Sequence, residues 1–388
     1  MKKLVAVLLS LLIVLSFTAC TNKQNNDDGP HVIKIGYVEN LTGKSSNSGS
    51  LCKRGIDLAH ELNNKINIKG VDYDVELVVV DAKSDKVESA NCASRVIEQE
   101  KVVAVLGPSN SGTNMAMTEI VEEAKIPAIC GTATNPLVTQ GYKYYFTACF
   151  TNNFHATVMA QYAYEAGFRK IAVVKEIDTD AAVDCANRFE DIFKKMTGDP
   201  DCIVTEVGYN VADQDYNAQL VALKQHTFDA IFAPNTAANL ALMMKQADDM
   251  GLHTKWMGID SCEVAAFIEI GGKSLIDNIY FSSFFDSGTA QTKETQKLFD
   301  EYAKRYSDVI AAHTAMSYDA YNLLIKGISD AQSLNGDDIV KAMEAIKNFE
   351  GASGYLSFNE NHNVENQAVI KTVGEDLKFK YVTTVKSK

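Results

Sequence analysis

The sequence predicts an α/β protein made of two doubly wound, parallel-sheet lobes. From residue 32 onward, short apolar segments typical of buried strands alternate with helical patterns of about ten residues or more. The alternation occurs in two runs, 32–150 and 153–282, and each run is long enough to form a domain. Strands that alternate with helices are typical of βαβ units, whose parallel sheets are covered by helices on both faces.

The first run is expected to form a sheet with helices between its strands. The strands are almost continuously apolar, as in "VVAVL" at 102–106, which fits burial on both faces of a sheet. The expected strands are 32–38, 74–81, 102–106, 126–130 and 144–150, and the expected helices are 51–65, 87–100 and 113–125.

The second run repeats the pattern, and a less regular segment follows it. Two doubly wound lobes side by side leave a cleft where the carboxyl ends of their strands face each other, and open α/β sheets bind ligands at that edge. Strands are expected at 170–174, 203–207, 228–233 and 254–259, then helices near 291–307, 313–330 and 336–347, and short strands from Gly354 onward.

The first twenty residues are typical of a secretory signal, because two lysines precede an apolar run that is too short to span a bilayer comfortably. The ending "TAC" resembles a lipobox, in which Cys20 is diacylated and becomes the mature N-terminus, although Phe17 stands where Leu is usual. Signal cleavage without a lipid is the alternative. Residues 21–31 are polar and read as a flexible tether. We therefore expect the chain outside the cytoplasm, lipid-anchored to the outer face of the cell membrane or periplasmic.

The composition argues against several functional classes. Asp and Glu outnumber Lys and Arg by 50 to 37, so nucleic acid is not expected as a main partner. The cysteines after Cys20 form no C-x-x-C pair and have no His at ligand spacing, which argues against a metal site, and Cys92, Cys130 and Cys149 are expected to be buried. Neither G-x-S-x-G nor H-E-x-x-H occurs. We expect a protein that is not an enzyme and carries no cofactor.

The stretch "VLGPSNSGTNMA" (105–116) suggests a ligand site. Gly107 and Gly112 have the spacing of a phosphate-binding loop, but Thr113 follows where that loop requires Lys, so nucleotide binding is not expected. A Gly-rich turn before a helix still offers main-chain N–H groups to a carboxylate, and the hydroxyl groups of Ser111 and Thr113 can add to them. The alternative is that one of these two residues only caps the helix.

A second loop, "CGTATNP" (130–136), ends the next strand of the same lobe. Thr132, Ala133 and Thr134 offer hydroxyl and N–H groups at the same sheet edge, one strand away from the first loop. The two loops together could hold one carboxylate. The alternative is a plain turn closed by the Asn-Pro pair.

An acidic residue ends a strand of the second lobe, at Asp260 in "WMGIDSCEV" (256–264). A carboxylate at a strand end that faces the cleft could pair with an ammonium group. Asp260 followed by Glu263 also has the spacing of a helix capping box, and the sequence leaves both interpretations open.

Taken in order, these segments resemble the extracellular solute-binding lipoproteins of ABC importers, in the branched-chain (leucine, isoleucine and valine) amino acid class. The resemblance covers roughly residues 32–385. It is carried by "IKIGYVENLTG" (33–43), "GPSNSGT" (107–113), "IPAICGTATNP" (126–136), "MMKQADDMGL" (243–252), "WMGID" (256–260) and "SYDAYNLL" (317–324).

The resemblance implies the type I periplasmic binding protein fold, a Venus flytrap whose two lobes are joined by a three-segment hinge. It also implies a monomer that delivers a small ligand to an ABC permease and its ATPase. We place the hinge crossings near 150–153, 282–286 and 357–360. The implied organisation is a signal peptide at 1–20, a tether at 21–31, lobe 1 at 32–151 plus 285–357, and lobe 2 at 152–284 plus 358–388.

The resemblance also assigns roles to residues of the expected site. Ser111 matches the loop serine that binds the ligand α-carboxylate in the family. Ala133 and Thr134 match the residues that complete the carboxylate and ammonium contacts, and Asp260 matches the acidic residue that receives the ammonium group.

Several positions depart from the family pattern, where aromatic residues wall the pocket around the ligand side chain. The chain has Ser48, Ala181, Thr236 and His313 at these places. Phe285, with its neighbour Phe284, could supply an aromatic wall or belong to the core of the hinge strand. The α-amino-acid anchor is therefore kept, whereas specificity for a leucine-like side chain is not implied.

The sequence thus predicts a binding lipoprotein that closes two lobes around a small amino-acid-like ligand and hands it to a membrane permease. The alternatives are an amide, a urea-like compound or another small polar solute as the ligand. A sensor that docks on a signalling receptor is a further alternative on the same fold.

Overall fold

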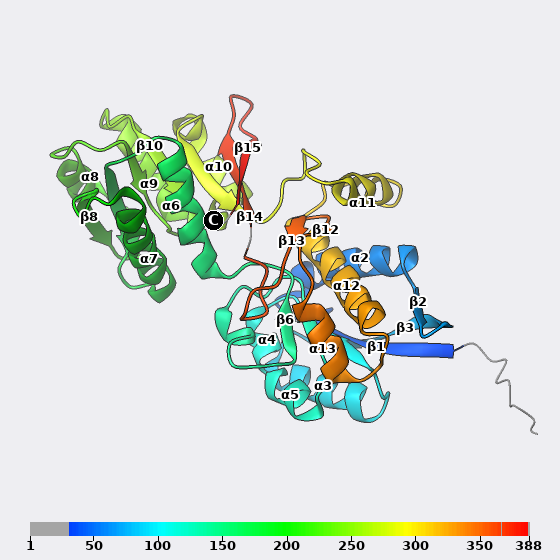
Figure 1. The fold of residues 1–388 in the computed structure, drawn as a ribbon. Coiled ribbons are helices and arrows are strands. Elements are labelled where there is room, and N and C mark those ends of the chain that lie inside the picture. Colours follow the sequence, from blue (N-terminus) through cyan, green and yellow to red (C-terminus); the bar gives the residue numbers. More distant parts are fainter. Residues whose placement is uncertain (1–30, 366, 387–388) are drawn as a thin grey trace, which may run out of the picture.

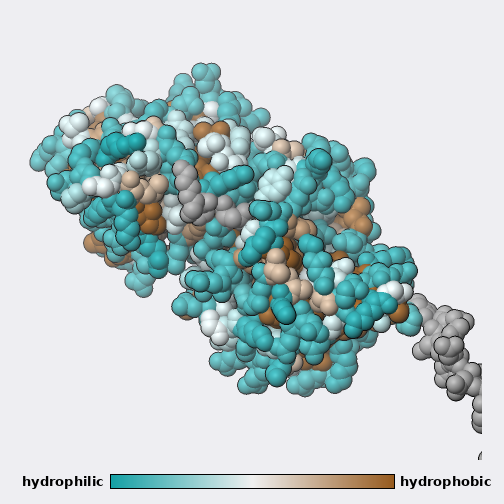
Figure 2. Space-filling model, in the orientation of Figure 1, coloured by the Kyte–Doolittle hydropathy of each residue, from teal (hydrophilic) through white to brown (hydrophobic). Residues whose placement is uncertain are grey.

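The computed structural model describes residues 31–365 and 367–386, which form two lobes, each built around its own sheet. Figure 1 shows the lobes side by side, and Figure 2 shows them as two masses with a mainly hydrophilic surface. The predicted pair of doubly wound α/β lobes is confirmed. The expected signal peptide, Cys20 and all of the tether except His31 lie outside the described residues. Within the described part, no helix combines the length and apolarity that a membrane span needs.

Lobe 1 is built on a sheet in the order β2-β3-β1-β4-β5-β6, which is parallel except for the antiparallel edge strand β2. The chain moves from β1 to β3 on one side and then to β4 on the other, so the strand order reverses between β1 and β4. Ligands of doubly wound sheets bind at such a reversal. The elements are β1 His31–Glu39, α2 Ser46–Leu62, β2 Lys65–Ile68, β3 Val71–Asp81, α3 Lys86–Glu98, β4 Ala104–Leu106, α4 Ser111–Met115, α5 Thr118–Ala124, β5 Ala128–Cys130 and β6 Tyr145–Thr147.

Lobe 2 follows the same plan, with a sheet in the order β15-β14-β11-β10-β9-β7-β8. Its order reverses between β7 and β9, and the last two strands are an antiparallel pair added at one edge. The elements are α6 Asn152–Glu165, β7 Ile171–Glu176, α7 Asp180–Thr197, β8 Ile203–Tyr209, α8 Asn217–Leu223, β9 Ala230–Phe232, α9 Ala237–Asp249, β10 Lys255–Gly258, α10 Ala265–Gly271, β11 Ile279–Ser283, β14 Gln367–Val373 and β15 Phe379–Lys386.

The segment after β11 returns to lobe 1 and completes its helical layer. Its long helix α12 packs against α2, where Gly55 leaves room for the backbone of Thr314. A Cβ atom at position 55 would lie closer than 3.0 Å to that backbone, so the two helices can approach this closely only because the residue is glycine. The elements are α11 Lys293–Ala303, α12 Ala312–Ala331, α13 Gly336–Glu344, β12 Phe349–Gly351 and β13 Gly354–Leu356.

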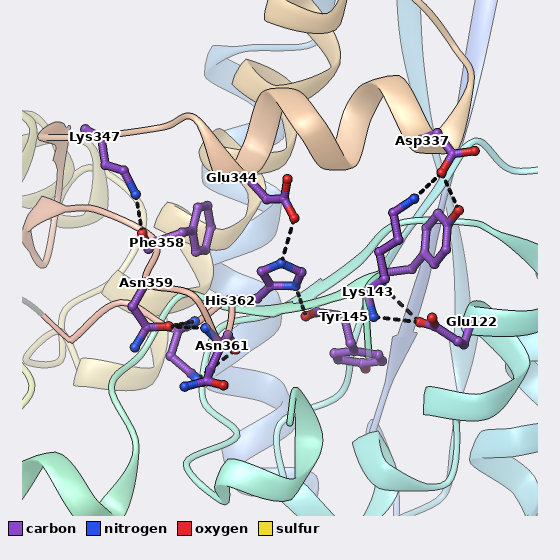
Figure 3. A network of polar contacts seen from close by, with 12 residues as sticks. Glu122, Lys143, Tyr145, Asp337, Glu344, Lys347, Phe358, Asn359, Asn361 and His362 are labelled. Atoms are coloured by element: carbon purple, nitrogen blue, oxygen red, sulfur yellow. Dashed lines mark hydrogen bonds and ion pairs between the residues drawn. The ribbon is translucent and has the colours of Figure 1, made fainter. Parts of the chain in front are cut away.

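The chain crosses between the lobes three times: between β6 and α6, between β11 and α11, and between β13 and β14. The third crossing is first anchored on lobe 1. The ring of His362 stacks on Phe146 with the ring centroids 4.1 Å apart. Its Nε2 atom lies 3.1 Å from a carboxylate oxygen of Glu344, as Figure 3 shows. The sequence placed this crossing near 357–360, whereas in the structure lobe 2 is reached only at β14, which begins at Gln367.

The sequence prediction and the structure differ in a few elements. The expected helix 113–125 is two short helices, α4 and α5, and strand β2 was not foreseen. The three strands β2, β14 and β15 pair antiparallel at the sheet edges, so the sheets are mixed rather than purely parallel. The cysteines of the described residues are all buried and free, as expected for Cys92, Cys130 and Cys149.

Candidate functional site

The loop after β4 presents a free serine hydroxyl group rather than a helix cap. The side chain of Asn110 caps α4 by accepting a hydrogen bond of 3.0 Å from the N–H group of Thr113. Neither Ser111 nor Thr113 performs the capping role that the sequence left open. The hydroxyl oxygen of Ser111 accepts a hydrogen bond of 3.2 Å from the N–H group of Asn135 in the second loop. Ser111 therefore joins the two predicted loops and keeps its own proton for donation to a ligand.

The second loop is fixed by contacts on both sides. The hydroxyl group of Thr132 donates to the carbonyl of Ser109 at 3.0 Å, so it supports the first loop. Ala133 is buried, and its carbonyl oxygen accepts from the Cys149 thiol at 3.4 Å. Thr134 is half-buried, and its carbonyl oxygen accepts a hydrogen bond of 3.0 Å from the first N–H group of α6, that of Asn152. This bond ties the loop of lobe 1 to the first helix of lobe 2.

A buried carboxylate, which the sequence analysis did not single out, lies beneath the first loop. Glu39 at the end of β1 is 1% exposed and accepts hydrogen bonds from the N–H groups of Asn40 at 2.7 Å and Ser109 at 2.8 Å. The hydroxyl group of Tyr37 donates to its other oxygen at 3.0 Å. Burial raises the pKa of Glu39 to about 7, although the hydrogen bonds oppose this shift. A charged residue that ends an apolar strand was the signal available in the sequence.

Asp260 lies in a short 3-10 helix directly after β10 and faces His155 of α6. The Nε2 atom of His155 is 3.1 Å from Oδ1 of Asp260, whose side chain keeps 37% of its surface exposed. Burial would raise the pKa of Asp260, but His155 and two main-chain N–H groups outweigh it and hold the pKa below its ordinary value. Asp260 is therefore ionised at neutral pH.

The capping-box interpretation of Asp260 and Glu263 is wrong. Helix α10 begins at Ala265, and its N-cap residue makes no side-chain capping bond. The carboxylate of Glu263 instead binds the ammonium group of Lys371 and the hydroxyl group of Ser283. Asp260 takes no part in capping and has His155 as its neighbour.

His155 is packed among aromatic rings at the hinge. It is fully buried, and its Nδ1 atom lies 2.7 Å from the hydroxyl oxygen of Ser282. The rings of Phe150 and Phe284 stack on each other at 4.1 Å and both contact the imidazole edge-on. Phe285, by contrast, is 3% exposed and packs in the core of lobe 1, so Phe284 rather than Phe285 supplies the aromatic surface at the hinge.

The residues that stand where the family has aromatic side chains lie in different surroundings. Ser48 lies in the first turn of α2, and the hydroxyl group of Thr236 donates to the buried carboxylate of Glu176 at 2.7 Å. His313 is half-buried in the first turn of α12. Burial lowers the pKa of His313, and the charge of Asp260 opposes that shift, which places these two residues of opposite lobes within electrostatic reach of each other.

One helical turn therefore connects the two halves of the predicted site. Helix α6 starts at the carbonyl group of Thr134 in lobe 1 and, three residues later, presents His155 to Asp260 in lobe 2. No sequence pattern points to His155, because a single His in an apolar helix has no distinctive spacing. The arrangement offers hydroxyl groups on one side and an ionised carboxylate on the other.

A separate cavity of about 820 Å³ opens beside the hinge. It is lined by charged residues that include Glu263, Asp286, Lys371 and Lys380, and by none of the predicted site residues. Its lining comes mainly from α10, the crossing after β11 and the β14–β15 hairpin.

Known proteins resemble the chain over almost its whole length. The family described as "Periplasmic binding protein" matches residues 32–376. A leucine-, isoleucine-, valine-, threonine- and alanine-binding protein of Pseudomonas aeruginosa is 24% identical over 86% of this chain and 87% of its own length. A leucine-binding protein from Thermotoga maritima is 31% identical, with a TM-score of 0.70 over 91% of this chain and 98% of its own.

A third similar protein is the branched-chain amino acid transporter substrate-binding protein of Streptococcus pneumoniae, whose structure was solved in complex with isoleucine. It is 26% identical, with a TM-score of 0.69 over 92% of this chain and 100% of its own.

Proposed function

Because the chain belongs to the periplasmic binding protein family, we propose that it captures a small amino-acid-like ligand between its lobes and delivers it to the permease of an ABC transporter. The relatives are binding proteins rather than enzymes. The ligand would be held at both of its charged ends, with the carboxylate on lobe 1 and the ammonium group on lobe 2.

The observation that carries the proposal is that the first turn of α6 contacts groups of opposite chemistry, the Thr134 loop of lobe 1 and Asp260 of lobe 2. Ser111 and the loop around Thr134 offer hydroxyl and N–H donors to a carboxylate, whereas Asp260 offers an ionised acceptor to an ammonium group. Charge-assisted hydrogen bonds of this kind are about twice as strong as neutral ones, and a zwitterion satisfies both ends at once.

The ligand screen uses the chain from residue 21 to 388, unfolded and refolded to remove any ligand that co-purifies. Thermal unfolding is recorded with each of the twenty amino acids, with amides and with urea-like compounds. A ligand present at a hundred times its Kd stabilises the folded protein by about 2.7 kcal/mol. We expect a shift with one group of α-amino acids and none with the amides.

Asp260→Asn tests the ammonium contact. It preserves the shape of the side chain and removes its charge, so the variant should lose about 2–5 kcal/mol of binding free energy. Asp249→Asn, at the exposed C-terminal end of α9, removes one negative charge away from the site and should leave the affinity within a factor of about two. An unchanged affinity in Asp260→Asn would assign the site to an amide or another ligand without an ammonium group.

We further propose that Cys20 carries a lipid that keeps the protein at the membrane surface. The proposal rests on the "TAC" ending of the signal segment, which lies outside the described residues. Cys20→Ser should release the protein into the soluble extracellular or periplasmic fraction and abolish labelling by a fatty-acid analogue. Unlabelled wild-type protein would support ordinary signal cleavage instead.

A further inference from the structure

The fully buried imidazole of His155 has one nitrogen with an aligned partner and one without. Its Nδ1 atom is 2.7 Å from the hydroxyl oxygen of Ser282. Its Nε2 atom lies 3.1 Å from a carboxylate oxygen of Asp260, but the geometry is not that of a hydrogen bond. A buried polar atom without an aligned partner is costly, so such atoms in folded proteins call for an explanation. Here the atom lies against the one carboxylate that is proposed to receive the ligand.

We propose that His155 is a positioning residue for Asp260 whose protonation decides whether the site accepts the ammonium group of a ligand. The inference rests on the proposed function. With a neutral imidazole, the His155–Asp260 pair carries one negative charge, which an ammonium group can neutralise. With a protonated imidazole the pair is neutral, because Asp260 then has its counter-ion inside the protein, and the ammonium group meets a positive charge instead.

Among the groups around this pair, we assign the change of protonation state to His155. The side chain of Asp260 keeps 37% of its surface exposed to water, and two main-chain N–H groups lower its pKa independently of His155, so its ionised form is favoured in either state of the imidazole. Burial raises the pKa of the Cys185 thiol on α7 to about 12, so that thiol stays neutral. His313 on α12 is a second imidazole within electrostatic reach of Asp260, and it needs its own control. On the elements packed against α6, Asp184 pairs with Arg188 and Glu190 with Lys194 on α7, and Lys371 on β14 binds Glu263 and Asp286. On β15, Lys380 pairs with Asp376 and the apolar Val385 packs in the core.

The proposal predicts opposite pH trends for two kinds of ligand. An amino acid and a proton compete for the His155–Asp260 pair, so binding of the amino acid should release a proton and weaken as the pH falls. A carboxylic acid that lacks the ammonium group leaves Asp260 unpaired when His155 is neutral. Its binding should therefore take up a proton and strengthen as the pH falls.

The experiment compares L-isoleucine with 3-methylpentanoate, which is the same molecule without its amino group. Binding is measured by titration calorimetry at about pH 8, 6.5 and 5.5, which spans the range where histidine ordinarily titrates, and in two buffers with different ionisation enthalpies to count protons. For isoleucine we expect binding to weaken from the highest to the lowest pH, by at most the factor of about ten per pH unit that release of one proton allows. For 3-methylpentanoate we expect the opposite slope.

His155→Gln and His313→Gln separate the two imidazoles. Glutamine can donate an N–H group to Asp260 but cannot take up a proton, so His155→Gln should bind isoleucine with a flat pH profile and without proton release. His313→Gln should keep the pH trend of the wild type, even if its affinity differs. A flat profile in His313→Gln with a sloping one in His155→Gln would overturn the proposal.

The outcomes distinguish this inference from the proposed function. If isoleucine does not bind, the amino acid with the largest thermal shift and its deaminated analogue replace the two probes. An amino acid that binds equally well at all three pH values, without proton release, would overturn the role of His155 while leaving the proposed function intact. Absence of binding by every amino acid would overturn both. If His155→Gln fails to fold, the two probes are compared on the wild type and on His313→Gln: opposite slopes that persist in His313→Gln would support the proposal, and their loss there would overturn it.

Discussion

Lys371 is the residue whose removal should most disturb the hinge. Its ammonium group on β14 is 2% exposed and binds two carboxylates, those of Glu263 and, at 3.3 Å, Asp286. Glu263 belongs to the loop that follows Asp260, and Asp286 belongs to the crossing that leads from β11 back to lobe 1. The ion cluster therefore fastens the second crossing and the Asp260 loop to the sheet of lobe 2.

Lys371→Met removes the positive charge but keeps the length of the apolar stem. Asp286 is 6% exposed and would be left as a buried charge without a counter-ion, with only the N–H group of Gly288 as a hydrogen-bond donor. Removal of one partner from a buried ion pair typically lowers the free energy of unfolding by about 3–5 kcal/mol. Removal of one partner from an exposed ion pair lowers it by only about 0–1 kcal/mol. Since Lys371 and Asp286 are both buried, we expect the larger loss in the free energy of unfolding, even though Glu263 is partly exposed.

The assay is urea unfolding of the ligand-free protein followed by circular dichroism, with the triple variant Lys371→Met, Glu263→Gln, Asp286→Asn as the rescue. If the cost comes from unpaired buried charge, the triple variant should recover most of the stability lost by the single one, because no charge remains buried. A single variant that loses less than about 1 kcal/mol would show that the cluster acts as a surface ion pair. A triple variant as unstable as the single one would refute the electrostatic reasoning.

Two further predictions concern the interior of lobe 1. Burial raises the pKa of Glu39 to about 7, above its value in the unfolded chain, so Glu39 contributes stability that is present at about pH 4 and is lost as the pH rises to about 7. The free energy of unfolding, measured with urea at about pH 4, 5.5 and 7.5, should therefore fall with rising pH by up to about 3 kcal/mol more in the wild type than in Glu39→Gln. The same pH dependence in both proteins would contradict the assignment. Gly55→Ala should destabilise by about 1–3 kcal/mol in thermal unfolding because its Cβ meets the backbone of Thr314, whereas Ser50→Ala on the exposed part of the same helix should be neutral or stabilising. Equal effects of the two alanines would show that α12 can move away.

The alternation of apolar strands and helices was sufficient to predict the two lobes, because buried parallel strands need continuous apolar sequence and leave a strong local signal. Strand β14, Gln367–Val373, is one of the short strands that were expected after Gly354. The antiparallel pairing of β14 with β11 was not visible, because pairing direction depends on where the chain returns after the third crossing and not on the strand itself. Strand β2 was missed for a related reason, since "KINI" is short and continues a helical pattern.

The site residues also differ in whether their role depends on neighbours in the chain or on contacts that are distant in the sequence. The loop around Ser111 and the position of Asp260 at a strand end could be predicted, because each depends on residues next to it in the chain. The position of His155 does not depend on its neighbours in the chain alone. It is placed by a hydrogen bond from Asn152 to Thr134 at one end of a helical turn and by the packing of Phe150 and Phe284 around its ring.

That placement has a mechanical consequence for closure of the lobes. A ligand carboxylate bound to Ser111 and Thr134 would engage the same loop that fixes the first N–H group of α6. The other end of that helical turn carries the imidazole that faces Asp260. Because backbone hydrogen bonds hold the residues of a helical turn together, a shift of the lobe 1 loop on binding a carboxylate would move His155 relative to Asp260, which is proposed to receive the ammonium group. Recognition of the two ends of the ligand would then be coupled through four residues of α6, so loss of the ammonium group should also weaken the contacts made to the carboxylate.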